Sequence, residues 1–185
     1  NEDFKRLCKI AREKRIHIIL DGVYSHTGDD SVYFNKKENY PGKGAWQGPE
    51  SPYYDWYHFD EDGNYDSWWG FQSLPEVDEM NEKFVNYIIT GQNSVIKHWL
   101  SLGASGFRLD VADELPDEFI FTMRKTLKSM FKNYALIGEV WEDATTKESY
   151  GMKRKYALGG GLDSTMNYPF KANVANYLLG HKNAY

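Results

Sequence analysis

Short, fully apolar segments alternate with amphipathic helical segments along most of this 185-residue chain. The first helical pattern covers residues 2–15, and an apolar run at residues 16–20 follows it directly. A continuous apolar run of this length is typical of a strand that is buried on both faces of a parallel sheet. The alternation therefore predicts an α/β fold in which helices cover a parallel sheet.

The remaining elements are expected in the same rhythm. In chain order they are a helix over 82–102 that Gly91 weakens, a strand over 106–111, a helix from Pro116 to about 131, a strand over 135–140, a shorter helix near 147–155, a strand around 162–166 and a helix from about 170. Residues 29–80 break the rhythm, because they hold turn signals and few periodic runs. A stretch this long predicts an inserted small domain rather than a connection. We therefore expect boundaries at 1–28, 29–80 and 81–185.

The composition limits the partners of the chain. Its net charge is −5 without a cluster of Lys and Arg, and its apolar runs are too short to span a bilayer, so neither nucleic acid nor a membrane is expected. The single cysteine, Cys8, excludes an internal disulfide and is expected in the core. Aromatic residues reach 16% and concentrate between Trp46 and Phe71, where they offer stacking surfaces for a ligand.

Carboxylates stand at the carboxyl ends of three predicted strands, namely Asp21, Asp110 and Glu139. A (β/α)₈ barrel gathers its active-site groups at this edge of its strands. A doubly wound sheet also binds ligands there, but no glycine-rich phosphate loop follows any of these strands. The pattern therefore favours the barrel.

Two carboxylates on neighbouring strand ends can act on an acetal. In a retaining glycosidase the nucleophile and the acid/base lie about 5–5.5 Å apart, which is close to the spacing of adjacent strands. Arg108 precedes Asp110 by two residues, so both side chains should lie on one face, where the cation would keep Asp110 ionised. Glu139 should instead have a raised pKa to donate a proton. The simpler alternative, that these carboxylates only cap helices or pair with a neighbouring arginine, stays open.

At these same residues the chain resembles the α-amylase family of glycoside hydrolases. Asp21–His26 resembles the first motif of the family, Gly106–Glu114 the second and Gly138–Trp141 the third. Leu74–Asp78 resembles the short motif near the end of the domain that the family inserts after its third barrel strand. The resemblance covers essentially the whole chain and implies a partial (β/α)₈ barrel, about strands 3 to 6, with residues 29–80 as the inserted domain.

The resemblance also implies roles for individual side chains. Asp110 would attack the anomeric carbon, and Glu139 would protonate the glycosidic oxygen and later activate water. Arg108 and His26 would hold the sugar at the cleavage position, with Asp21 as a buried supporting carboxylate. Five aromatic residues of the inserted domain are candidates for sugar stacking or for its own core: Trp46, Tyr54, Trp56, Trp68 and Trp69.

Within the family, Leu109–Glu114 is most similar to the neopullulanase and cyclomaltodextrinase branch, as are Ser51–Tyr53 and Asp163–Pro169. Glu114 stands where that branch places a glutamate near the leaving-group sugar, and Trp141 of the third motif is expected to contact substrate. Some amylopullulanases share these features. The implied substrates are starch-like α-glucans, pullulan or cyclodextrins.

The chain also departs from the family pattern. Ser25 replaces an asparagine that ligates calcium in many members, so no calcium is expected there; a structural calcium elsewhere in a longer parent stays open, and no cofactor is required. Asp113 replaces the asparagine common in the branch. The fourth motif of the family has no counterpart after Glu139. We therefore expect a piece of a longer parent that is inactive alone and that, with open sheet edges, is either marginally stable or associates through them.

Several alternatives remain open on the sequence. The parent can transfer glucosyl units rather than hydrolyse them, since both routes share the covalent intermediate. A carbohydrate-binding relative without catalysis is a second alternative, although such proteins typically lose the carboxylates kept here. A nucleotide-binding α/β domain is a third. A homodimeric parent, and a cytoplasmic or secreted location, also stay open.

Overall fold

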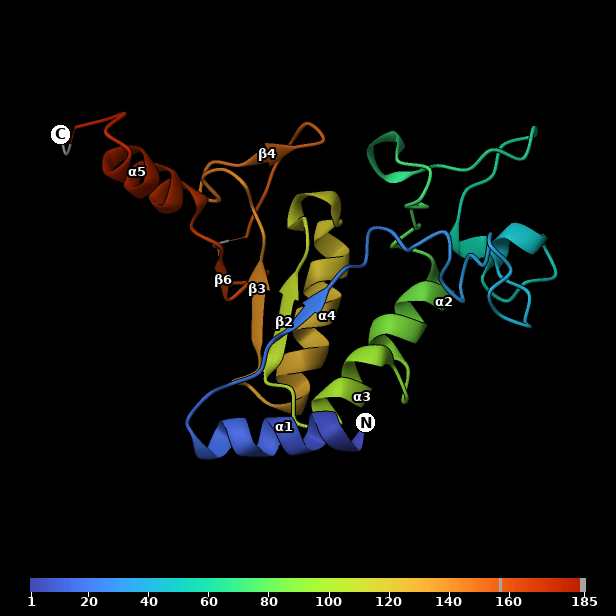
Figure 1. The fold of residues 1–185 in the computed structure, drawn as a ribbon, viewed down its shortest axis with the longest axis horizontal. Coiled ribbons are helices and arrows are strands. Elements are labelled where there is room, and N and C mark those ends of the chain that lie inside the picture. Colours follow the sequence, from blue (N-terminus) through green and yellow to red (C-terminus); the bar gives the residue numbers. More distant parts are fainter. Residues whose placement is uncertain (157, 184–185) are drawn as a thin grey trace. The chain divides into compact units, whose positions relative to one another are not determined.

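Four short strands form the sheet that carries the predicted carboxylates. The computed structural model describes residues 1–156 and 158–183. The sheet has the order β1-β2-β3-β6, with β1 at Leu20–Gly22, β2 at Gly106–Leu109, β3 at Ala135–Gly138 and β6 at Ser164–Thr165. β2 pairs with β3 in parallel, and β3 pairs with β6 in parallel. The predicted α/β class with a parallel sheet is confirmed (Figure 1).

The chain divides into two units. The first unit comprises residues 1–17 and 22–104, and the second comprises residues 18–21 and 105–185. The domain boundaries expected from the sequence stay a prediction.

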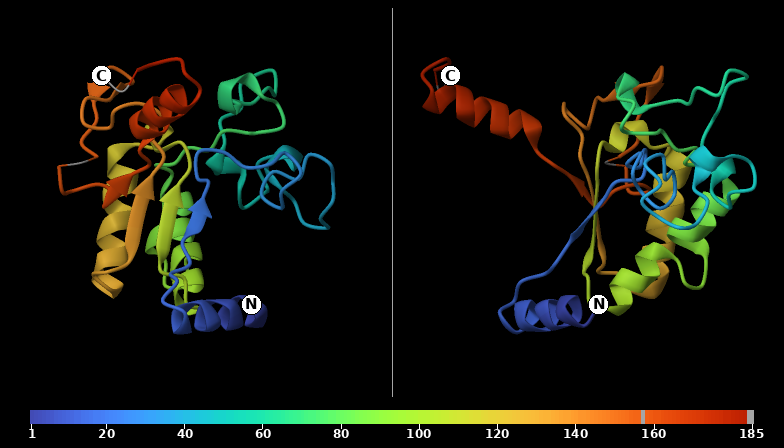
Figure 2. Two further views of the ribbon diagram at one scale, coloured as in Figure 1. Left: turned by 60° about the vertical axis from the view of Figure 1, so that its left-hand side comes forward. Right: turned by 45° about the vertical axis from the view of Figure 1, so that its right-hand side comes forward.

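In the second unit, helix α4 (Asp117–Met130) runs along one face of the sheet (Figure 2). The helix begins one residue after the expected Pro116, which is its N-cap. Its apolar stripe, including Met123 and Leu127, is fully buried, as are Leu109 and Leu136 on the sheet. The core of this unit therefore lies between α4 and the sheet, and it holds the strand ends in fixed register.

The helix predicted near residues 147–155 is wrong. The segment forms a two-stranded antiparallel hairpin, β4 (Glu148–Ser149) and β5 (Met152–Lys153). Tyr150 and Gly151 connect the strands with φ of 52° and 73°. Two consecutive positive φ values form the turn whose twist matches a two-residue hairpin, and a helix cannot accommodate them.

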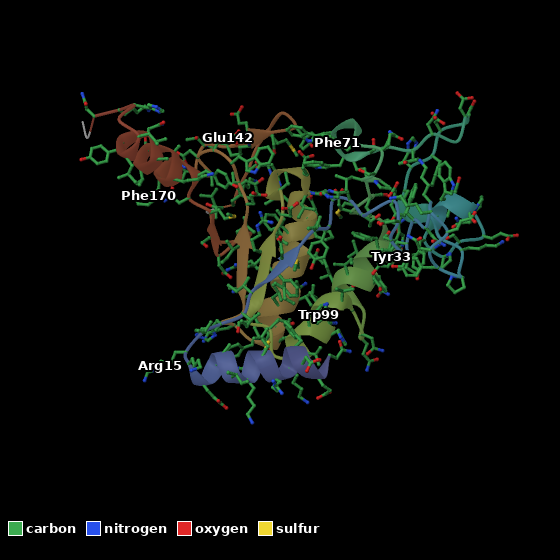
Figure 3. The ribbon with its side chains drawn as sticks, in the orientation of Figure 1. Arg15, Tyr33, Phe71, Trp99, Glu142 and Phe170 are labelled. Carbon is green, nitrogen blue, oxygen red and sulfur yellow. The ribbon has the colours of Figure 1, made fainter. Side chains whose placement is uncertain are left out.

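The helix expected from about residue 170 is confirmed as α5 (Tyr168–Leu178). Asn167 caps it by accepting a hydrogen bond from the backbone N–H of Phe170. No side chain of α5 is buried, and Phe170 points away from the sheet (Figure 3). Among the described residues, no helix is long and apolar enough to cross a membrane.

In the first unit, helix α1 (Glu2–Glu13) packs against α3 (Val95–Ser101). The rings of Phe4 and Trp99 meet edge to face with centroids 5.0 Å apart, and Trp99 reaches toward α1 in Figure 3. Cys8 is buried there, as predicted. Gly103 allows this close approach, because a Cβ on it would lie 2.8 Å from that of Cys8.

The single helix predicted over 82–102 is wrong, because the chain breaks it. Helix α2 (Glu82–Val85) continues as one π turn (Asn86–Thr90), and α3 starts only at Val95. Gly91 has a ψ of 154°, which ends the helical path, and its N–H donates a hydrogen bond to the carbonyl of Asn86. The glycine that weakens the pattern in the sequence therefore terminates it.

The strand expected at residues 16–20 also differs from the prediction. It is limited to β1, and Ile16 and Ile19 are exposed rather than buried on both faces. β1 is the edge strand of the sheet in the described part of the chain, so it has a neighbour on one side only. Residues 29–80 contain three 3₁₀ turns (Ala45–Gln47, Tyr54–Trp56 and Trp68–Gly70) around an aromatic core, in which the buried ring of Phe34 contacts Tyr57, Phe59 and Tyr65.

Candidate active site

The register of the sheet places Asp110 and Glu139 side by side. Leu109 of β2 is paired with Gly138 of β3, and each carboxylate residue follows directly. The backbone pairing continues beyond the strands, since the N–H of Glu139 donates a hydrogen bond to the carbonyl of Leu109 at 2.9 Å. Gly138 packs tightly here, because a Cβ on it would lie 2.3 Å from the Leu162 side chain and 3.1 Å from the Cβ of Ala112, so a larger residue would force Leu162 to move.

One guanidinium connects three carboxylates at this edge. Arg108 Nη1 lies 2.6 Å from Asp21 Oδ1 and 2.6 Å from Asp110 Oδ1. Its Nη2 lies 2.9 Å from Glu139 Oε2. The predicted shared face of Arg108 and Asp110 is confirmed. Since one cation faces three carboxylates, the formal charge of this group stays negative.

The members of this network differ in exposure. The side chains of Arg108 and Asp110 are each 23% exposed, and that of Glu139 is 10% exposed. The side chain of Asp21 is 61% exposed, so the expectation of a buried carboxylate there is wrong. Asp21 lies on the edge strand β1, which explains its exposure.

Hydrogen bonds hold Glu139 in its ionised form. Burial raises the pKa of this carboxyl, but hydrogen bonds donated by Tyr168, the backbone of Val111 and Trp141, with the charge of Arg108, outweigh burial and lower it below its ordinary value. The Tyr168 O–H lies 2.6 Å from Oε1, and the Val111 N–H donates to Oε2 at 3.1 Å. The raised pKa expected from the sequence is therefore wrong for this arrangement.

The residue after Asp110 has a strained backbone. Val111 has φ 37° and ψ 60°, a left-handed conformation that β-branched residues avoid. Such a conformation costs roughly 1–3 kcal/mol and is found at functional sites when the surroundings enforce it. Here the conformation of Val111 directs its N–H at the carboxylate of Glu139. The backbone next to Asp110 therefore helps to position Glu139.

Sequence reasoning missed Tyr168. It is the first residue of α5, and its hydroxyl is the partner of Glu139 described above. The hydrogen bond raises the pKa of the Tyr168 phenol. The available signal was its place in Asp163–Pro169, the segment that resembles the branch, directly after β6, which pairs with β3.

The departure at Asp113 has a structural explanation. Its Oδ1 accepts a 2.6 Å hydrogen bond from the Tyr156 hydroxyl, and its Oδ2 lies 3.1 Å from Lys147 Nζ. An asparagine would lose the ion pair with Lys147. The carboxylate therefore fastens the loop after β2 to the segment around the β4–β5 hairpin.

Two further predicted site residues lie on the same loops. Glu114 accepts a hydrogen bond from the hydroxyl of Tyr150 in the hairpin turn. Trp141 follows Glu139 by two residues, is exposed and is hydrogen-bonded to the Glu139 side chain. The structure thus brings Trp141 to Glu139, and Glu114 to the hairpin.

His26 belongs to the first unit, where its Nδ1 lies 3.1 Å from the hydroxyl of Ser25. Its ring centroid is 5.1 Å from that of Trp68. The role of His26 in holding a sugar stays a prediction. Ser25 is buried with its hydroxyl on the imidazole. The absence of calcium at that position stays a prediction.

The aromatic residues of segment 29–80 fall into two groups. Trp56 is buried at 3% exposure, so it is core and not a surface for sugar stacking. Trp69 and Trp46 are exposed, and Trp69 stacks on Trp68 with centroids 5.5 Å apart. Tyr54 stacks on Phe59 at 4.9 Å. Stacking on a sugar stays a prediction for these four candidates.

The chain matches the family model described as alpha amylase, catalytic domain, over residues 1–184. It belongs to the α-amylase family. An amylopullulanase of Thermoanaerobacterium thermosulfurigenes is 37% identical over 197 residues, which cover 97% of this chain and 10% of that protein. Neopullulanase 2 of Thermoactinomyces vulgaris is 30% identical over 94% of this chain and 28% of that protein.

Among solved structures, Ttha1563 from Thermus thermophilus is similar with a TM-score of 0.75 and 30% identity. That match covers 96% of this chain and 35% of the solved one. This α-amylase family chain therefore spans between about a tenth and about a third of the length of these similar proteins. The membership of the family that the motifs indicated is confirmed. The names of the amylopullulanase and the neopullulanase are those of glycosidases.

Proposed function

We propose that the protein containing this chain is a retaining glycosidase that cleaves α-glucosidic bonds of starch-like α-glucans, pullulan or cyclodextrins. The observation that carries the proposal is the pairing of Arg108 with both Asp110 and Glu139 on adjacent strand ends. Two carboxylates on adjacent strand ends, one nucleophilic and one able to exchange a proton, are what retention requires.

In the first step, an Asp110 oxygen attacks the anomeric carbon and forms a covalent ester with the sugar. The glycosidic C–O bond breaks, and Glu139 gives its proton to the departing oxygen. Arg108, 2.6 Å from Asp110 Oδ1, holds the carboxylate in place for this attack. Because the carboxylates outnumber the cation, the network also favours the positive charge that develops on the sugar ring.

In the second step, a water molecule attacks the anomeric carbon and releases Asp110. Glu139 accepts a proton from that water, so it must be ionised at this stage. The hydrogen bonds from Tyr168 and Val111 favour this ionised form. They oppose the protonated form that the first step needs, and Tyr168 thereby influences the pH at which the cycle runs.

The remaining assignments complete the proposal. Asp21, His26, Glu114 and Trp141 contact the substrate, with Arg108 at the cleavage position. The chain supplies about strands 3 to 6 of a (β/α)₈ barrel with residues 29–80 as an inserted domain, and the rest of the parent supplies the other strands and the third catalytic carboxylate. The isolated chain is therefore inactive. No cofactor takes part, and the parent can form a homodimer.

The test is an assay of the full-length parent on pullulan, cyclodextrin and soluble starch. An Asp110→Asn variant should lose activity by about 10⁴-fold or more, because a catalytic group is removed without a change of shape. Asp62→Asn in an exposed turn is the matched control and should keep full activity. Product analysis with excess acceptor sugar separates hydrolysis from glucosyl transfer. A folded parent that cleaves none of the three substrates would contradict the proposal.

A further inference from the structure

An exposed tyrosine stands at the tip of the β4–β5 hairpin, which follows β3 in the chain and is labelled β4 in Figure 1. The side chain of Tyr150 lies in the turn and the residue is 72% exposed. Its φ of 52° is a conformation that glycine and asparagine adopt readily and that a bulky aromatic residue does not. A large ring kept in solvent at a conformational cost indicates a function other than folding.

The ring of Tyr150 has a fixed orientation. Its hydroxyl donates a hydrogen bond to Glu114 Oε2. Since the backbone turn fixes one end of the side chain and the carboxylate fixes the other, the ring loses little further freedom when a ligand stacks on it. Preorganised aromatic faces of this kind suit the apolar face of a sugar ring.

A buried arginine holds the hairpin onto the loop that carries Glu114. The side chain of Arg154 is only 3% exposed. It donates hydrogen bonds to the carbonyls of Asp113 at 2.8 Å and Leu115 at 2.5 Å, and to the hydroxyl of Ser149 at 2.8 Å. These contacts join the residues on either side of Glu114 to the strand that precedes Tyr150.

The loop that carries Glu114 begins at Asp110, the proposed nucleophile. Glu114 follows Asp110 by four residues, so their Cα atoms lie at most roughly 14 Å apart. Asp113, next to Glu114, is bonded to Tyr156 and Lys147 from the hairpin segment. The hairpin is therefore fastened close to the carboxylates through several independent contacts.

We propose that Tyr150 is a specificity-determining residue whose ring stacks on a glucose unit of the α-glucan chain beside the cleavage position, with Glu114 as the residue that orients it. This inference rests on the proposed glycosidase function. It assigns the hairpin a role in recognising longer chains, while Asp110 and Glu139 act at the bond that is cleaved.

The experiment compares two substrates of the full-length parent. Maltohexaose extends beyond the cleavage position, whereas α-D-glucosyl fluoride fills that position alone. In Tyr150→Asn, which suits the positive φ, the kcat/KM for maltohexaose should fall roughly two- to tenfold relative to that for the fluoride. Tyr150→Phe keeps the ring and should show a smaller decrease.

Met152→Ala is the matched control, because Met152 is also exposed on this hairpin, and it should leave the ratio of the two kcat/KM values unchanged. An unchanged ratio in Tyr150→Asn, or equal losses on both substrates, would overturn the inference. A folded wild-type parent that cleaves neither substrate would instead overturn the proposed function, and this inference with it.

Discussion

Two arginines of the second unit organise the loops at the carboxyl ends of the strands, and they do so in different ways. Arg108 is partly exposed, and its ion-pair partners are the carboxylates of Asp21, Asp110 and Glu139. Arg154 is almost fully buried, and its partners include two backbone carbonyls and the Ser149 hydroxyl, besides one carboxylate, Asp117.

The difference separates chemistry from architecture. Three carboxylates share the one cation of Arg108, so its ion-pair partners can change during a reaction. The carbonyls around Arg154 cannot change charge, and burial makes each of these hydrogen bonds costly to leave unmade. Arg108 should therefore matter for rate, and Arg154 for the stability of the loops.

Of the changes that test this comparison of the two arginines, Arg154→Met should have the largest effect, and that effect is on stability. This change leaves buried carbonyls and Asp117 without their donor, so the free energy of unfolding should fall by about 3–5 kcal/mol. Thermal unfolding of the full-length parent measures it, with Lys155→Met at the neighbouring exposed position as the control. Equal melting temperatures for the two variants would show that Arg154 does not stabilise the loops and would contradict this prediction.

A somewhat smaller effect, on catalysis, is expected from Arg108→Lys. A lysine keeps the charge but cannot bridge three carboxylates, so kcat/KM should fall roughly 10²- to 10³-fold. The melting temperature should change little. Activity measurements beside Arg6→Lys, an exposed position on α1, test this. A variant with normal kcat/KM but much reduced stability would assign Arg108 to architecture instead.

The smallest of these effects concerns the pKa of Glu139, one of the carboxylates that Arg108 contacts. Tyr168→Phe removes a hydrogen bond that lowers the pKa of Glu139, so that pKa should rise. Glu139 then keeps its proton to higher pH, and the alkaline limb of the kcat/KM profile should move to higher pH. The rate at the optimum should change by roughly tenfold or less. The matched control is Tyr177→Phe, on the exposed surface of the same helix; an identical limb in both variants would contradict the prediction.

The arrangement of Asp110 and Glu139 could be predicted because it depends on local rules. The apolar runs before Asp110 and Glu139 form parallel strands with a largely buried pattern, and a two-residue spacing places Arg108 and Asp110 on one face. The contact between Tyr168 and Glu139 could not be predicted, because it depends on how β6 and α5 follow β3. The sign of the Glu139 pKa shift depends on the same contact, since burial alone would have given the opposite sign.

The hairpin shows a second limit of the sequence pattern. Residues 147–155 contain Lys, Glu, Met and Arg, which favour helices, and this local preference produced the wrong prediction. Tertiary contacts of Arg154 and Tyr156 with the loop after β2 outweigh the preference. Gly91 is the opposite case, because the sequence marked it as a weak point of its helix and the structure ends the helical path there.

The proposed mechanism depends on a covalent bond between Asp110 and the sugar. The most direct test treats the full-length parent with 5-fluoro-α-D-glucosyl fluoride, which forms the ester quickly and releases it slowly, and then maps the modified peptide by mass spectrometry. One fluoroglucosyl group per protein should be added, on Asp110, and none in Asp110→Asn. A label on Glu139, or substrate turnover by the parent without any labelled carboxylate, would contradict it.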